Sequence, residues 1–160
     1  MATEDKVFTG NIPAIYEKFM VPMLFEPYAR DIAGRLAKFQ PKTILELAAG
    51  TGAVTRAVAQ RLASDARMTV TDLNQPMLEE ARTKLANDSR ITWRQADALA
   101  LPFADQSFEA AICQFGAMFF PDKIKGFSEA RRVLKPGGHF IFNVWDRLAN
   151  NEFVVVVQDV

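Results

Sequence analysis

The sequence predicts an α/β fold: a Rossmann-like, doubly wound parallel sheet with flanking helices, truncated after its fifth strand. From residue 43 onward, short apolar segments alternate with segments of helical periodicity, an order typical of parallel sheets with right-handed crossovers. A turn of small residues, 48–52, separates the first apolar segment from a helix-compatible one. Acidic residues end or follow the first three apolar segments, at Glu46, Asp72 and Asp97. Ligands of such sheets bind outside the carboxyl ends of the strands, so these carboxylates are candidates for a site.

Two amphipathic helices are expected before the sheet, over residues 12–21 and 27–39. In the second, Tyr28, Ile32 and Leu36 recur every four residues, which puts them on one face. Pro76 suits the first turn of a later helix, and residues 136–138 (PGG) are expected to end the last one. The expected strands are 43–47, 68–72, 91–94, 110–114 and 139–145, and the helices between them are 54–62, 76–86 and 122–134.

Composition describes one ordinary globular domain. The 160 residues carry 19 basic and 19 acidic side chains, and 49% are apolar. No basic stripe indicates nucleic-acid binding. A single cysteine, Cys113, excludes an internal disulfide and fits a reducing compartment. No signal-like region or run of 18 apolar residues is present, so we expect a cytoplasmic protein without membrane insertion. We divide it into a helical cap (1–40), a Rossmann-like core (41–146) and the start of a C-terminal segment (147–160).

The turn after the first strand reads ILELAAGTG over residues 44–52. Gly50 and Gly52 can take a positive φ and allow close approach of a ligand to the backbone. A dinucleotide fingerprint would require a third glycine, but Thr55 stands there. Glu46 would repel a pyrophosphate and suits a cationic ligand such as a sulfonium. A turn without any ligand is the alternative interpretation.

Four further segments accompany this turn. Asp72 lies about 20 residues after it, a spacing that suits an acid accepting from both ribose hydroxyls. Leu73 follows that acid, and a third strand runs into Asp97 and Ala98. Two longer stretches follow, residues 101–109 (LPFADQSFE) and 129–138 (EARRVLKPGG).

Together these motifs resemble the class I S-adenosylmethionine-dependent methyltransferases, nearest to their ubiquinone/menaquinone-biosynthesis branch. Ala48 departs from the family's first motif, where a glycine is usual, and Glu109 replaces an aspartate. The resemblance implies S-adenosylmethionine as cofactor and S-adenosylhomocysteine as product. It also implies that Asp97 accepts from the adenine amino group. The candidate cofactor-binding residues are Tyr16, Glu46, Ala48, Gly50, Gly52, Asp72, Leu73, Asp97, Ala98 and Gln114.

The predicted function is methyl transfer to a small, mostly apolar acceptor. Aromatic residues gather around the expected mouth of the site: Tyr16, Phe19, Phe115, Phe119, Phe120 and Trp145. The sequence identifies no catalytic base and no metal site, and positioning of the acceptor can supply much of the rate. His139, the only histidine, lies at a strand start and is expected to be structural. Two alternatives stay open: a cofactor-binding fragment without activity, and a nicotinamide-dependent oxidoreductase.

The end of the chain carries two opposed signals. Residues 153–157 favour a strand by propensity, whereas the resemblance implies a helix that starts near Asn151. The antiparallel strand pair that completes the family's sheet has no residues here. Strand 139–145 therefore has an open edge without Lys, Pro or an acidic residue. We expect this edge, or residues 153–157, to contact a second chain, as in a homo-oligomer.

Overall fold

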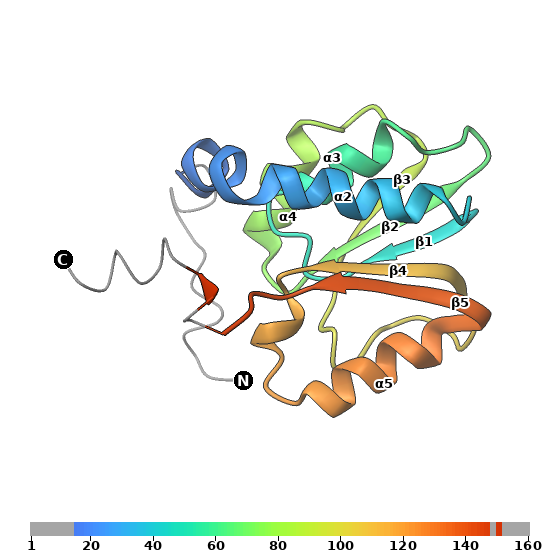
Figure 1. Ribbon diagram of the computed structural model, residues 1–160. Coiled ribbons are helices and arrows are strands. Elements are labelled where there is room, and N and C mark those ends of the chain that lie inside the picture. The colour runs from blue at the N-terminus through green and yellow to red at the C-terminus, as the bar shows by residue number, and fades with distance from the viewer. Residues whose placement is uncertain (1–14, 148–149, 152–160) are drawn as a thin grey trace.

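The computed structural model of the chain describes residues 15–147, 150 and 151, and Figure 1 shows a central sheet with helices above and below it. The helical elements and the strands follow in chain order: η2 (Tyr16–Phe25), α2 (Glu26–Ala37), β1 (Thr43–Glu46), α3 (Ala53–Ala59), β2 (Arg67–Asp72), α4 (Gln75–Thr83), β3 (Ile91–Gln95), β4 (Phe108–Gln114), η3 (Ala117–Phe119), α5 (Lys123–Val133) and β5 (Leu134–Asn143).

All five strands are parallel and lie in the order β3-β2-β1-β4-β5. Strand order therefore reverses between β1 and β4, which are adjacent in space. The predicted doubly wound parallel sheet is confirmed, and β5 is the last strand within the described residues. No helix in residues 15–147 or 150–151 is long and apolar enough to cross a membrane.

Helices cover both faces of the sheet (Figure 1). On one face, α2, α3 and α4 bury small and branched side chains against β1, β2 and β3; Ile32, Val58 and Leu78 are among them. On the other face, α5 packs Ala130 and Val133 against β1 and β4 together with the loop before β4. This leaves the carboxyl ends of the strands as an open edge between the two layers.

The N-terminal helices differ from the expected pair. Residues 16–25 form a π-helix, η2, that contains Pro22 and passes directly into α2. The expected start at residue 12 lies outside the described residues. On the predicted face of α2, Ile32 and Leu36 are buried, whereas Tyr28 is 43% exposed and contacts the Phe115 and Trp145 rings. The inward face begins at Ala29, because spacings of three and four residues from Ala29 reach Ile32 and Ala33.

The last strand also begins earlier than predicted. β5 starts at Leu134, immediately after α5, and the PGG segment lies inside it rather than before it. Phe108 of β4 pairs with Leu134, and Ala110 pairs with His139. Four residues of β5 thus oppose a single residue of β4, and this irregularity absorbs the Pro and the left-handed Gly137 (φ 77°). Strand pairing with β4 therefore continues across a sequence that locally favours a turn.

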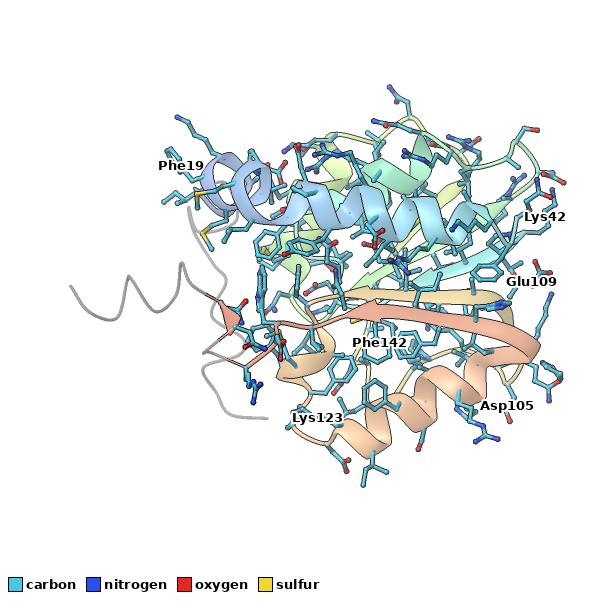
Figure 2. The ribbon with its side chains drawn as sticks, viewed as in Figure 1. Phe19, Lys42, Asp105, Glu109, Lys123 and Phe142 are labelled. Atoms are coloured by element: carbon cyan, nitrogen blue, oxygen red, sulfur yellow. The ribbon has the colours of Figure 1, made fainter. Side chains whose placement is uncertain are left out.

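Charged groups join three strands at the end of the sheet opposite the carboxyl edge. Glu109 accepts from the Lys42 backbone N–H at 2.7 Å and pairs with Lys135 at 3.0 Å. The Lys42 N–H, followed by the Lys135 ammonium, lowers the pKa of Glu109. Figure 2 shows Lys42 and Glu109 at this end and Phe19 on η2 at the other. Glu109 therefore has a structural role in holding the strand starts together.

Candidate functional site

A cavity of about 620 Å³ lies at the carboxyl edge of the sheet. Its walls come from η2, from the ends of β1, β2 and β4, and from the segments that follow β2, β3, β4 and β5. The lining residues are Met20, Leu24, Phe25, Ala48, Thr71, Asp72, Leu73, Asn74, Met77, Ala96, Asp97, Ala98, Leu99, Gln114, Phe115, Gly116, Phe119, Phe120, Pro121 and Trp145.

Asp72 is the most constrained polar group of this cavity. It ends β2 and is 7% exposed. The Gly50 N–H donates to its Oδ2 at 2.8 Å, and the Asn74 N–H donates to its Oδ1 at 2.8 Å. Burial raises the pKa of Asp72, and the bonds from Asn74 and Gly50 oppose this shift. The carboxyl group is thus fixed in direction, with lone pairs left for a ligand.

The turn after β1 brings the backbone close to Asp72. A Cβ on Gly50 (φ 57°) would meet no atom within 4 Å, so space is open beside this residue, whereas a Cβ on Gly52 (φ 80°) would lie 2.9 Å from the Ala81 Cβ. Gly52 therefore serves close packing of the turn against α4, and Gly50 serves the turn conformation itself. Ala48 also has a positive φ of 52°, which is strained for a residue with a Cβ.

Glu46 lies behind this turn rather than on the cavity wall. It is 2% exposed, and its Oε2 accepts from the Thr55 hydroxyl at 2.7 Å. Burial raises the pKa of Glu46 to about 8, and the hydrogen bond from Thr55 only partly offsets this. The carboxyl is therefore largely protonated at pH 7, so the charge expected for a cationic ligand is present only if the ligand lowers that pKa.

The segment after β3 supplies the far end of the cavity. Asp97 and Ala98 both line it, and the Asp97 Oδ1 accepts from the Leu99 N–H at 2.9 Å. Leu73 lies opposite, at the end of the neighbouring strand β2. A planar group between these residues would meet a carboxylate, a backbone N–H and an apolar side chain.

The other half of the cavity is aromatic. The Phe115 ring stacks on Trp145, with ring centroids 4.1 Å apart, and contacts Phe25 and Tyr28 at 5.6 and 5.1 Å. Phe115 has a φ of 55°, a strained value for a bulky residue. Its N–H donates to Asn143 at both the backbone oxygen and Oδ1, at 3.1 and 3.0 Å. The strain is thus held by bonds to β5 and by ring packing.

Ion pairs hold η2 over this half. Glu17 pairs with Arg56 of α3 at 2.8 Å and with Lys84, which follows α4. Arg56 also donates to the Thr51 carbonyl of the turn at 2.9 Å. One carboxylate therefore links η2 to both helices next to the turn, and η2 in turn supplies Met20, Leu24 and Phe25 to the cavity wall.

The structure brings together six of the ten predicted cofactor residues on one cavity: Ala48, Asp72, Leu73, Asp97, Ala98 and Gln114. Glu46, Gly50 and Gly52 are not among the lining residues, and the Tyr16 side chain is outside the described part of the structure. Of the predicted aromatic residues, Phe115, Phe119, Phe120 and Trp145 line the cavity, whereas Phe19 is 58% exposed and does not. His139 stacks on Phe39, with centroids 3.7 Å apart, away from the site.

Several lining residues carried no recognisable signal in the sequence. Met20, Leu24 and Phe25 belong to the unexpected π-helix, and their spacing does not identify a cavity wall. Asn74 is different, because an acid two residues before an N–H donor is a common local turn. The pair Asp72 and Asn74 could have been predicted from that pattern.

Comparison with known proteins agrees with this geometry. A family model described as a methyltransferase domain matches residues 44–138. The chain belongs to this family. The matched methyltransferase domain runs from β1 into the irregular start of β5. Together with the relatives described next, this match confirms the predicted resemblance to S-adenosylmethionine-dependent methyltransferases of the quinone-biosynthesis branch.

Relatives of the domain share its central part. A demethylmenaquinone methyltransferase from Clavibacter sepedonicus is 45% identical over 98 residues, which cover 61% of this chain and 39% of that protein. A ubiquinone/menaquinone biosynthesis C-methyltransferase UbiE from Klebsiella pneumoniae is 38% identical over 103 residues, covering 62% and 41%. The chain thus spans about two fifths of the length of these curated relatives.

Solved structures agree on the fold. A structure described as a putative S-adenosyl-L-methionine-dependent methyltransferase from Methanococcus maripaludis matches with a TM-score of 0.77 at 23% identity, covering 99% of this chain and 75% of the other. An S-adenosylmethionine-dependent methyltransferase from Mesorhizobium loti matches with a TM-score of 0.62 at 29% identity, covering 74% and 52%. The predicted Rossmann-like class is confirmed by these neighbours.

Proposed function

We propose that this chain binds S-adenosylmethionine in the cavity at the carboxyl edge and serves methyl transfer to a small, mostly apolar acceptor. The observation that carries the proposal is the pair of acidic residues, Asp72 and Asp97, on the half of one cavity that lies opposite a cluster of aromatic rings. An adenosine end and an apolar acceptor call for these two environments side by side.

The residues fit the nucleoside part of the cofactor. Asp72 is oriented by the N–H groups of Gly50 and Asn74, and its remaining lone pairs are suited to two ribose hydroxyls. Asp97 and the Ala98 N–H are suited to the adenine edge, and Leu73 to the adenine face. Ala48, Gly50 and Gly52 form the turn that lets the ligand approach the backbone, with Glu46 behind it.

The bound cofactor would supply an electrophilic methyl group on a sulfonium. The contribution of the chain is to orient the acceptor and to exclude water from the cavity, with rings such as Phe115 and Trp145 forming the apolar wall. Orientation of this kind can account for a large part of a rate enhancement. The catalytic role of an acid or base is assigned to no residue.

A quinone-type ring is the acceptor class that we favour. The relatives named for demethylmenaquinone and for ubiquinone/menaquinone biosynthesis support it, and so does the aromatic half of the cavity, since planar rings stack on aromatic side chains. The proposal also includes a cytoplasmic location, the division into a cap (1–40), core (41–146) and C-terminal segment, and a homo-oligomer through the β5 edge.

Calorimetric titration tests the proposal directly. The chain is titrated with S-adenosylmethionine, S-adenosylhomocysteine and NAD. Binding of the first two without NAD is the expected result, and binding of NAD alone would favour the nicotinamide-dependent alternative. A second assay follows methyl transfer to quinol acceptors. Cofactor binding without transfer to any acceptor would favour the binding-only alternative.

A further inference from the structure

Gln114 ends β4 and is one of the residues that line the cavity. Its Nε2 donates to the Phe25 carbonyl oxygen at 3.2 Å. Because a carbonyl oxygen can only accept, the amide nitrogen has to face Phe25. The other end of the amide, Oε1, is therefore directed away from η2.

That oxygen, Oε1 of Gln114, is buried and finds no donor in the described part of the chain. Buried polar atoms are nearly always hydrogen-bonded, and an unmet one costs free energy. The rings of Phe25 and Phe115, which line the same cavity, carry no hydrogen-bond donor. A ligand with an O–H group in this half of the cavity would remove the cost.

The order of the strands separates this oxygen from the nucleoside end of the site. β1 lies between β2, which ends at Asp72, and β4, which ends at Gln114. Neighbouring strands are about 4.8 Å apart, so the two strand ends are roughly 10 Å apart along the edge. The missing hydrogen-bond donor is therefore expected on a bound group that lies beyond the nucleoside, among the aromatic rings.

Resting on the proposed function, we propose that Gln114 selects the methyl acceptor: its Oε1 accepts a hydrogen bond from a hydroxyl group on a planar apolar acceptor. A neutral amide holds this proton without removing it, so the role of Gln114 is orientation and selection rather than base catalysis. This assigns the side-chain oxygen of Gln114 to the acceptor, where the sequence alone assigned the residue to the cofactor.

The test uses two probes that differ in one donor, 1-naphthol and 1-methoxynaphthalene, titrated into the S-adenosylhomocysteine-saturated chain. The wild-type chain is expected to bind 1-naphthol roughly tenfold more tightly, the size of one hydrogen bond to a buried acceptor. Gln114→Leu is expected to abolish this preference and to leave the affinity for S-adenosylhomocysteine within about twofold, since that part of the site is untouched.

Gln95→Leu is the matched control. Gln95 ends β3, and its Nε2 donates to the Leu73 carbonyl at 2.7 Å, so this variant loses the same kind of bond at an exposed strand end. It is expected to keep the preference for 1-naphthol. Gln114→Met, with an unbranched side chain of similar length, replaces Gln114→Leu if that variant does not fold.

Each other outcome overturns the inference. Equal binding of the two probes by the wild-type chain would show that the site does not recognise the hydroxyl group. If the Gln114 variants retain the preference, another residue accepts the hydrogen bond from the hydroxyl group. A tenfold loss of S-adenosylhomocysteine affinity with the preference intact would assign Oε1 to the cofactor. Failure of the wild-type chain to bind S-adenosylhomocysteine would instead refute the proposed function, on which the inference rests.

Discussion

Glu46→Gln separates the charge of the buried carboxyl from its shape. Glu46 is 2% exposed, and its Oε2 accepts from the Thr55 hydroxyl at 2.7 Å. A glutamine side chain has the same size and retains an oxygen that can accept this bond. The variant should therefore fold normally and differ from the wild type only in lacking a titratable group at position 46.

The sign of the effect follows from the raised pKa. Burial raises the pKa of Glu46 from 4.5 to about 8 in the folded chain, so between these values the folded state holds a proton that the unfolded state has lost. The free energy of unfolding then falls as pH rises, by about 1.4 kcal/mol per pH unit for one proton. Across the window the loss is on the order of 5 kcal/mol. It is absent below pH 4.5 and complete above pH 8. In Glu46→Gln this contribution disappears.

Chemical denaturation of both proteins from pH 5 to pH 9 measures the difference. The stability advantage of Glu46→Gln over the wild type should grow with pH and level off near the pKa of Glu46. Burial also raises the pKa of Asp72. Because Asp72 is present in both proteins, its contribution cancels when their unfolding free energies are subtracted. The control is Glu79→Gln on the exposed side of α4, where the carboxylate accepts from Gln75 at 3.2 Å. Parallel curves for wild type and Glu46→Gln would refute the reasoning.

Four further predictions concern the ribose acid, two glycines next to the cavity and the edge strand. Asp72→Ala should weaken S-adenosylhomocysteine binding by roughly 1–3 kcal/mol, because two ribose hydroxyls lose a charged acceptor; unchanged affinity by calorimetry would remove Asp72 from the site. Gly50→Ala should cost about 1 kcal/mol of stability, because its φ of 57° is left-handed although space for a Cβ is open; a larger loss by denaturation would indicate a clash instead. Gly116→Ala should be strongly destabilising, because its Cβ would lie 2.3 Å from the Ala48 Cβ, and adding Ala48→Gly should recover part of the loss; strictly additive effects in the double mutant would exclude this contact. Sedimentation should detect an oligomer that forms through the edge of β5. A monomer at high concentration would show that the unpaired edge of β5 does not cause association.

The alternation of strands and helices in this fold could be predicted from the sequence, because the patterns that indicate each element are local. β1, β2 and β4 each contain a short apolar segment, and Glu46, Asp72 and Gln114 lie at their carboxyl ends as predicted. Strand ends of a parallel sheet meet at one edge, so residues far apart in the chain could be grouped without knowing any contact. Half of the cavity wall was accessible to this argument.

Other features depend on contacts that no local pattern records. The PGG segment favours a turn by itself, but pairing with β4 continues the strand across it. Likewise, the π-helix places Phe25 beside Gln114, residues 89 positions apart, through one hydrogen bond. Neither periodicity nor propensity identifies such a contact, so the wall that η2 contributes could not be predicted.

Two of the residues with a strained backbone lie where the sheet reverses its order. Ala48 and Phe115 follow the adjacent strands β1 and β4, and both have a positive φ without being glycine. After Ala48 the chain turns to α3 on one face, and after Phe115 it turns to η3 and α5 on the other. Two sharp turns in opposite directions open a crevice between the strand ends, the position at which doubly wound sheets bind ligands. The cost of each strained residue, about 1–3 kcal/mol, is tolerated because both turns are fixed by packing on either side of the cavity.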